Sequence, residues 1–161
     1  MKWQSSCVCL NLRRAARAIS QTYDEALAPS GIKITQFSLL RAVERNEPVA
    51  ISALADELDL DRTTMARNLA PLERKRLLAL AAGSDLRVTE VRLTPKGRAV
   101  VARALPLWQS AQAEIAGLLA SGRIDQLREI AAEAVAAAEK LRGGQNETVA
   151  EKPKRRSRPR K

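Results

Sequence analysis

The chain has 161 residues, a formal net charge of +10 and a pI near 10.4, which favour a polyanionic partner such as nucleic acid. It contains no histidine, so it lacks the commonest general base and the commonest metal ligand. Because the sequence also has no Gly-rich phosphate loop and no nucleophile elbow, we expect no enzyme, no cofactor and no metal site.

The composition also bears on the compartment and the assembly of the protein. No apolar run approaches membrane-spanning length, and the first residues, MKWQSSCVCLNLRR, lack the layout of a signal peptide. Two cysteines, Cys7 and Cys9, are too few for a disulfide framework. We therefore expect a cytoplasmic protein without membrane contact, built as one domain that pairs with a second copy.

Two helices are predicted in the first third of the chain. Apolar residues at helical spacing predict the first over about residues 6–28, and Pro29-Ser30-Gly31 ends it. The second helix, TQFSLLRAVER, is expected to begin with Thr35 as its N-cap, with Ile34 and Leu39 placed as a hydrophobic staple. Residues 49–51 are then long enough only for a short strand.

The segment over residues 51–77, ISALADELDLDRTTMARNLAPLERKRL, predicts two short helices joined by a tight turn. The first runs from about Ser52, as its N-cap, to Leu58, and Asp61 caps the second. One face of the second helix is apolar and is expected to be buried through Met65, Leu69 and Leu72. Pro71 removes one backbone hydrogen bond, so this helix either kinks there or ends earlier.

The opposite face of that second helix carries polar and basic side chains. Hydroxyl, amide and guanidinium groups near a helix N-terminus suit base edges and phosphates of a DNA major groove. The expected base contacts come from Thr63, Thr64 and Arg67, flanked by Asn68, and the expected phosphate contacts from Arg62 and Arg74. The alternative is an ordinary amphipathic helix with a solvated face, because a helix-turn-helix pattern alone is weakly specific.

A β-hairpin is predicted directly after the two helices. Residues 77–82 (LLALAA) are apolar, residues 88–93 (VTEVRL) alternate, and a polar tip joins them. Arg87 at the tip is placed to reach an adjacent minor groove; the alternative is a solvated loop arginine. Asp85 is acidic and is expected to hold Arg87 or the hairpin by a local hydrogen bond. A helix-turn-helix followed by a hairpin is a winged helix.

Two helices and a tail follow the wing. Thr94 and Pro95 suit the N-cap and first residue of a helix that reaches about Ala120, with a possible bend at Pro106, and a last helix covers about residues 125–141. The apolar stripes of the first and last two helices exceed what one winged helix covers, so we expect a two-fold homodimer. From Gly143 the composition predicts a disordered basic tail, which either adds phosphate affinity or only solubilises the chain.

Cys7 and Cys9 have two interpretations. They either pack as small apolar residues in a dimer-forming helix, or they form a thiol switch, because Cys7 precedes or begins a helix whose dipole favours the thiolate. Arg13 and Arg14 lie nearby, and their positive charges also favour the thiolate. Helix positions i and i+2 point about 200° apart, so a disulfide between the two within one chain is not expected.

These segments resemble the MarR family of bacterial transcription regulators. The resemblance rests on the sequence DRTTMARNLAPLERKRLL, on Asp85-x-Arg87 in the wing and on the exit Leu93-Thr94-Pro95-Lys96-Gly97, and it covers about residues 8–141. Two departures stand out. The family's usual Lys-Gly-Leu after the recognition helix is Lys75-Arg76-Leu77 here, and Pro71 lies inside the helix.

The resemblance implies a mainly α fold with a small β-wing over residues 1–142. A winged helix-turn-helix lobe, about residues 33–94, would be flanked by dimerisation helices over about 6–28 and 95–141, with the tail at 143–161 outside the fold. It also implies a homodimeric regulator, usually a repressor, that binds a pseudo-palindromic operator in double-stranded DNA and is released by a small effector or by oxidation.

Relatives in this family bind small aromatic or anionic effectors between the dimer helices and the winged helix. The residues placed to line such a cleft are Arg17, Tyr23, Phe37, Trp108 and Gln112, although residues of these kinds more often form core. The competing function is a winged helix used as a protein-interaction or structural module. Such a module would expose large apolar residues where this chain has Arg67 and Arg74.

Overall fold

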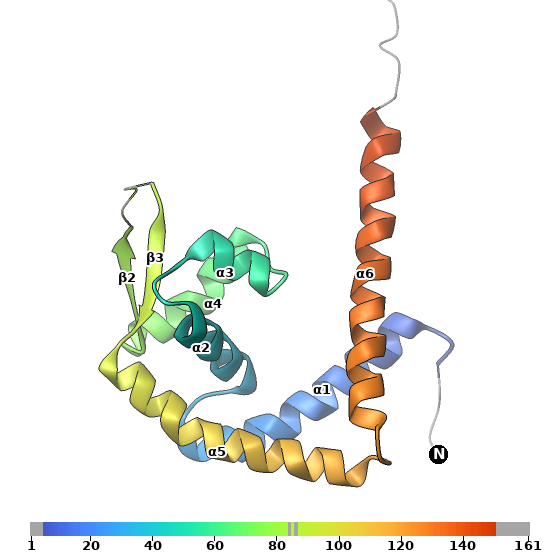
Figure 1. Ribbon diagram of the computed structural model, residues 1–161, viewed down its shortest axis with the longest axis horizontal. Coiled ribbons are helices and arrows are strands. Elements are labelled where there is room, and N and C mark those ends of the chain that lie inside the picture. Colours follow the sequence, from blue (N-terminus) through green and yellow to red (C-terminus); the bar gives the residue numbers. More distant parts are fainter. Residues whose placement is uncertain (1–4, 84, 86, 151–161) are drawn as a thin grey trace, which may run out of the picture. The chain divides into compact units, whose positions relative to one another are not determined.

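The computed structural model describes residues 5–83, 85 and 87–150, with the backbone alone over 143–150. The chain divides into two compact units, Met1–Glu114 and Ile115–Lys161. The first unit contains helices, strands and a 3-10 helix in the order α1 (Val8–Leu27), η1 (Ala28–Ser30), α2 (Ile34–Asn46), β1 (Val49–Ala50), α3 (Ile51–Glu57), α4 (Arg62–Arg74), β2 (Leu78–Ala82) and β3 (Thr89–Leu93), and most of α5 (Pro95–Leu118) (Figure 1). The second unit contains the end of α5 and α6 (Arg123–Ala150). The predicted fold class, mainly α with a small β-wing, is confirmed.

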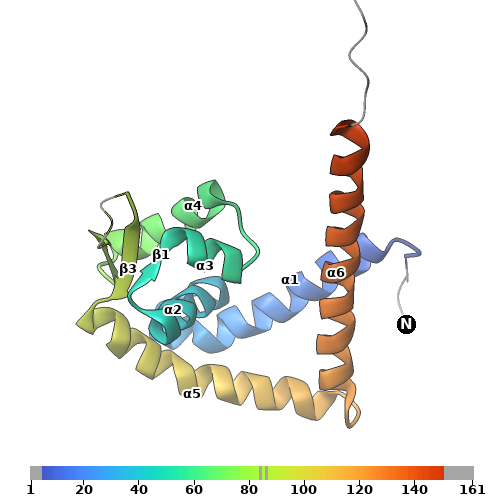
Figure 2. The ribbon, with the colours of Figure 1, turned by 45° about the horizontal axis from the view of Figure 1, so that its top comes forward.

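The small sheet of the first unit has the antiparallel order β1-β3-β2. Val91 of the central strand pairs with Val49 of β1 and Leu80 of β2. Val91 and Leu93 are buried and Arg92 between them is exposed, as expected for a strand with one face on the core. Helices α2, α3 and α4 pack beside the hairpin in both ribbon views (Figures 1 and 2), and their fully buried side chains form the core with the sheet: Leu40, Leu54, Met65, Leu69 and Leu72.

The start of α2 differs from the prediction. Thr35 is not the N-cap, because the helix begins at Ile34 and its N-cap residue is Lys33. The Ile34 amide donates a hydrogen bond of 2.7 Å to the carboxylate of Asp24 on α1. The Gln36 side chain accepts a second hydrogen bond, from the Lys33 amide. A carboxylate from another helix therefore replaces the expected local cap.

The start of α3 also differs. Ser52 is not its N-cap, because the helix begins at Ile51 and follows directly on Ala50, which has extended backbone angles and caps without a side chain. Ala50 pairs with Glu90 of β3, so the strand ends where the helix begins. At the other end of α3, Glu57 bonds to Arg45 and Asn46 of α2, each at 2.7 Å, and joins the two helices.

Helix α4 continues past Pro71 to Arg74, so of the two alternatives left open, a kink or an earlier end, the earlier end is excluded. Beyond Arg74 the chain forms a Schellman motif, in which the amides of Arg76 and Leu77 donate to the carbonyls of Glu73 and Leu72. Arg76 therefore adopts a left-handed φ of 57°, the conformation that glycine takes most readily at this position.

Replacing Arg76 by glycine is expected to raise the free energy of unfolding by about 0.5–1 kcal/mol, because glycine removes the steric cost of the left-handed conformation. Urea unfolding followed by circular dichroism measures the change. Arg74→Gly is the matched control, since Arg74 has helical geometry and is expected to lose about 1 kcal/mol. A stability loss in Arg76→Gly would show that the Arg76 side chain contributes more than its backbone conformation costs.

The junction between wing and α5 is held by Thr94. Its hydroxyl donates to the Arg76 carbonyl at 2.7 Å and accepts from the Gly97 amide at 3.0 Å, so it caps α5 and also ties that helix to the end of α4. This confirms the predicted N-cap. Gly97 lies directly against the Leu77 backbone, since a Cβ built on it would be 2.1 Å from the Leu77 carbonyl oxygen.

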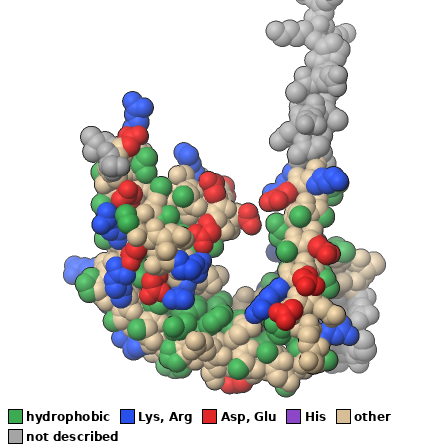
Figure 3. Space-filling model, in the orientation of Figure 1, with side chains coloured by type: hydrophobic (Ala, Val, Ile, Leu, Met, Phe, Trp, Pro, Cys, Tyr) green, Lys and Arg blue, Asp and Glu red, His purple; other side chains and the backbone are tan. Residues whose placement is uncertain are grey.

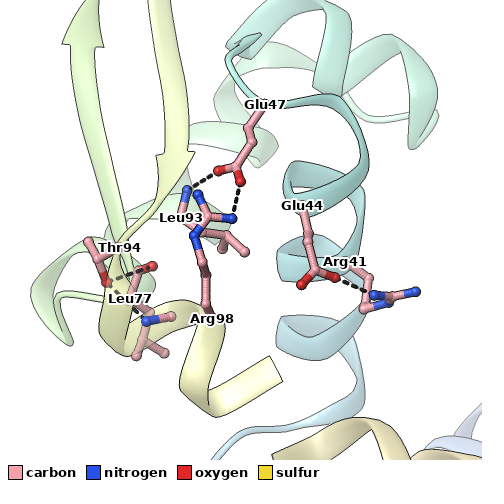
Figure 4. Close-up of polar contacts among 8 residues, drawn as sticks. Arg41, Glu44, Glu47, Leu77, Leu93, Thr94 and Arg98 are labelled. Atoms are coloured by element: carbon pink, nitrogen blue, oxygen red, sulfur yellow. Dashed lines mark hydrogen bonds and ion pairs between the residues drawn. The ribbon is translucent and has the colours of Figure 1, made fainter. Parts of the chain in front are cut away.

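Glu47, which the sequence analysis did not single out, joins three elements. Its carboxylate accepts a hydrogen bond of 2.7 Å from the Leu93 amide and forms an ion pair with Arg98 of α5 (Figure 4). The side chain is only 14% exposed. The loop between α2 and β1 is thereby fixed to the end of the wing and to the start of α5.

The second unit consists mainly of α6, which begins after the positive-φ residue Gly122. The helix was predicted over 125–141 but extends to Ala150, so a disordered tail does not begin at Gly143. Residues 151–161, the basic part of that predicted tail, lie outside the described residues. In the part of the chain that is described, no helix is long and apolar enough to cross a membrane.

Candidate nucleic-acid interface

Helix α4 is oriented by its buried apolar stripe. Met65, Leu69 and Leu72 are at most 1% exposed and pack in the core, as predicted. The side chains expected to meet DNA consequently lie on the outer side of the helix. Arg62, Thr63, Arg67, Asn68 and Arg74 are all exposed, and Thr64 is half-buried.

The N-cap of α4 fixes the hydroxyl of Thr64. Asp61 accepts hydrogen bonds from the Thr64 amide at 2.9 Å and from the Thr64 hydroxyl at 2.6 Å, which confirms Asp61 as the cap. Because its hydrogen is donated to Asp61, the Thr64 hydroxyl has only lone pairs left to offer a ligand.

The same hydrogen bonds keep Asp61 ionised. The hydroxyl of Thr64 first, and its amide second, hold the pKa of the Asp61 carboxyl below its ordinary value. A carboxyl whose pKa is lower in the folded state contributes stability above its ordinary pKa. That contribution is lost as the pH falls through the lowered value.

The wing tip is organised by Asp85. Its carboxylate accepts a hydrogen bond of 2.9 Å from the Arg87 amide, and its carbonyl accepts one from the Val88 amide. These bonds fix the backbone of the tip and leave the Arg87 side chain exposed. In Figure 3 a basic side chain stands at the end of the hairpin, and others lie over the winged-helix lobe among acidic ones.

A hollow of about 230 Å³ lies between the wing and the two short helices. Arg62 at the start of α4 and Arg87 of the wing line it together, although they are 25 residues apart in the sequence. The other lining residues are Ile51, Ser52, Val88 and Thr89. We call this the wing hollow. Ser52 and Thr89 were not predicted as site residues, because nothing in the sequence pattern indicates that three separate elements meet here.

The five residues proposed for an effector cleft make different contacts within the single chain. The Tyr23 hydroxyl donates a hydrogen bond to Gln112, and the rings of Phe37 and Trp108 lie 5.9 Å apart. Arg17 instead lines an open groove of about 690 Å³ along α1, which none of the other four residues lines. A cleft lined by all five residues in a dimer therefore stays a prediction. Tyr23 and Phe37 are buried and serve as core residues.

Both cysteines are free and exposed. Cys7 is the N-cap of α1 with extended backbone angles, and its amide donates to the Ser5 hydroxyl, whereas Cys9 lies in the first helical turn. Because Cys7 precedes the helix, helical spacing does not fix its direction relative to Cys9. Among the described residues, no group of three or more Cys, Asp or Glu side chains is arranged to hold a metal ion.

Comparison with known proteins places this geometry in a family. A model of the MarR family matches residues 30–87. The M. tuberculosis transcriptional regulator MosR in complex with DNA is 39% identical, with a TM-score of 0.79, over 85% of this chain and 99% of that chain. MosR in a second crystal structure is 38% identical, with a TM-score of 0.73, over 84% and 98%. A comparison with curated proteins finds no match.

More distant structures share the fold. The S. aureus MepR–DNA complex is 18% identical with a TM-score of 0.73 over 83% of this chain and 99% of that chain. Apo MarR from E. coli is 20% identical with a TM-score of 0.63 over 81% and 98%. Given the 39% identity to MosR over nearly all of that regulator, the chain belongs to the MarR family of winged-helix, DNA-binding transcriptional regulators.

Proposed function

We propose that this protein is a homodimeric repressor that binds a pseudo-palindromic operator and is released by a small effector or by thiol oxidation. The observation that carries the proposal is the outer face of α4, where polar and basic side chains are exposed opposite a fully buried stripe. The similar structures of MosR and MepR include complexes with DNA. Half-site centres about 10–10.5 base pairs apart are expected for a two-fold dimer.

In this proposal the exposed residues have different roles along the interface. Thr63, Thr64 and Arg67 meet base edges, Arg62 and Arg74 meet phosphates, and Arg87 reaches the flanking minor groove. Because the Thr64 hydroxyl can only accept, it complements the exocyclic amino group of adenine or cytosine and not a carbonyl of guanine or thymine. Asn68 lies beside Thr64 and Arg67 on the same exposed side.

The exposed side chains argue against a protein-interaction module. The large exposed apolar residues in the described part of the chain are Val8, Leu10 and Leu12 on α1, and Leu118, Leu119, Leu127, Ile130, Val135 and Leu141 farther along. They are absent from the exposed face of α4, where an adaptor would need them. Their position on the terminal helices supports dimerisation through those helices.

Arg67→Ala and Arg87→Ala are each expected to weaken operator binding without changing the fold. If Arg67 pairs with a guanine, its loss should cost about 1–3 kcal/mol and relax specificity at one position in each half-site. Genomic footprinting identifies the operator, and fluorescence anisotropy then measures the affinity of each variant. The matched control is Arg103→Ala, an exposed arginine on α5. Unchanged affinity in both variants, with unchanged circular dichroism, would refute this docking.

Oxidation of Cys7 and Cys9 is one of the two candidate releasing signals. If the two cysteines form a switch, mild peroxide should abolish operator binding and a thiol reductant should restore it, because sulfenic acid and disulfide are reversible states. A gel-shift titration of the parent and of the Cys7→Ser, Cys9→Ser double variant tests this, and intact mass identifies the product. Equal insensitivity of both proteins would leave a small effector as the signal.

A further inference from the structure

The wing hollow gathers side chains that carry hydrogen-bond donors. Arg62 and Arg87 bring two guanidinium groups, and Ser52 and Thr89 bring two hydroxyl groups. No carboxylate is among the six lining residues. Within the described residues, none of these four side chains takes part in a hydrogen bond or ion pair. Other arginines of this unit, such as Arg45 and Arg98, do pair with carboxylates.

Two unpaired guanidinium groups in one hollow repel each other, and an anion between them removes that cost. Arginine offers five N–H donors in a rigid planar arrangement that matches the oxygens of a phosphate group. The hydroxyl groups of Ser52 and Thr89 add further donors, and Ile51 and Val88 form the apolar part of the lining. The chemistry of the lining therefore suits an oxyanion such as a phosphate group.

The volume of the wing hollow distinguishes a single phosphate group from a whole small-molecule ligand. A water molecule occupies about 30 Å³ in the liquid, so 230 Å³ accommodates a phosphate group and a few waters. Sites for whole small-molecule ligands are about 300–1,000 Å³. The hollow is thus suited to one phosphate group and is smaller than an effector site.

We propose that the wing hollow binds one phosphate of the DNA backbone in each half-site, held between Arg62 and Arg87. This inference rests on the proposed function, because Arg62 opens the recognition helix and Arg87 belongs to the wing, so DNA docked on α4 brings its backbone to both. The shared phosphate couples the wing to the helix. With five donors, Arg87 can bind this phosphate and still reach the minor groove.

The test is a methylphosphonate scan of the operator, in which each phosphate is made neutral in turn. One phosphate in each half-site is expected to lower the affinity of the parent by about 10-fold or more when neutralised. The same replacement should have little effect on Arg62→Ala and on Arg87→Ala, while Arg103→Ala should respond like the parent. The Arg62→Ala, Arg87→Ala double variant should lose less affinity than the product of the single losses.

The outcomes separate this inference from the proposed function. If the parent binds a two-fold operator but no phosphate shows this dependence on Arg62 and Arg87, or if the two losses multiply independently, the shared phosphate is refuted and the repressor remains. If the parent binds no operator, the proposed function fails first. Circular dichroism of each variant confirms that the fold is intact.

A second experiment tests whether the wing hollow binds free inorganic phosphate and not a DNA phosphate. Operator binding is measured in inorganic phosphate and in sodium chloride at equal ionic strength. Equal inhibition by both salts is the expected result for a site made for DNA phosphate. Stronger inhibition by inorganic phosphate in the parent, absent in Arg62→Ala, would reassign the hollow to free phosphate and overturn the proposal.

Discussion

Replacing Gly97 by alanine is expected to lower the free energy of unfolding by about 3 kcal/mol or more. A Cβ at this position would lie 2.1 Å from the carbonyl oxygen of Leu77 and 3.0 Å from its carbonyl carbon. Both atoms belong to the backbone, so no side-chain rotation can make room. The start of α5 would have to move away from the end of α4, and the Thr94 hydrogen bonds that join them would stretch.

Denaturant unfolding followed by circular dichroism measures this loss. Gly117→Ala is the matched control in the same helix, because nothing lies within 4 Å of a Cβ built there. It is expected to leave stability unchanged or to raise it by up to about 1 kcal/mol. Gly83→Ala is intermediate, since its Cβ meets only the Glu90 side chain, which can rotate. A loss below about 1 kcal/mol in Gly97→Ala would contradict the close approach.

The recognition helix was predictable because its signals are local. An aspartate cap, an apolar stripe at helical spacing and a basic outer face all lie within residues 61–74, and each describes the same helix. The wing was predictable for a similar reason, since strand alternation and a polar tip lie within residues 77–93. The burial of Met65 and Leu72 and the register of the hairpin agree with these patterns.

The wrong predictions concern contacts between distant residues. The cap of α2 is supplied by Asp24, ten residues before Ile34 and on another helix, so the nearby threonine was chosen in its place. Ser52 was assigned as a cap, but the pairing of Ala50 with Glu90 carries the strand directly into the helix. In both cases tertiary contact outweighs the local preference.

Arg76 keeps the backbone conformation that the family resemblance implies although the residue type differs. The resemblance implies glycine at position 76, where this chain has arginine. The backbone still takes the left-handed conformation there and completes both hydrogen bonds of the motif. The Thr94 contact to the Arg76 carbonyl and the close packing of Gly97 hold the segment in place. The surrounding structure therefore imposes a conformation that the residue itself disfavours.

Changing Leu127 and Ile130 together to aspartate is expected to convert the proposed dimer to a monomer and to abolish binding to the proposed operator. These residues are 43% and 58% exposed and lie three apart on α6, so they share one face of the helix. Burial of each side chain in a dimer contributes about 1.5–3 kcal/mol, and a two-fold interface contains each residue twice. The double change therefore removes about 6 kcal/mol or more, a factor above about 10⁴ in the dimer dissociation constant.

Sedimentation equilibrium at micromolar concentration measures the mass, with 17.6 kDa expected for the monomer. The matched control is Ala132→Asp with Ala136→Asp, two exposed positions that lie about opposite on the same helix at 100° per residue. Alanine has a higher helix propensity than leucine or isoleucine. Replacing two alanines by aspartate therefore destabilises α6 itself at least as strongly as replacing Leu127 and Ile130. If both double variants dissociate, loss of helix is the cause; if neither does, the apolar face of α6 is not the dimer interface. Dissociation of the first alone, with loss of operator binding, ties DNA recognition to a second copy of the winged helix.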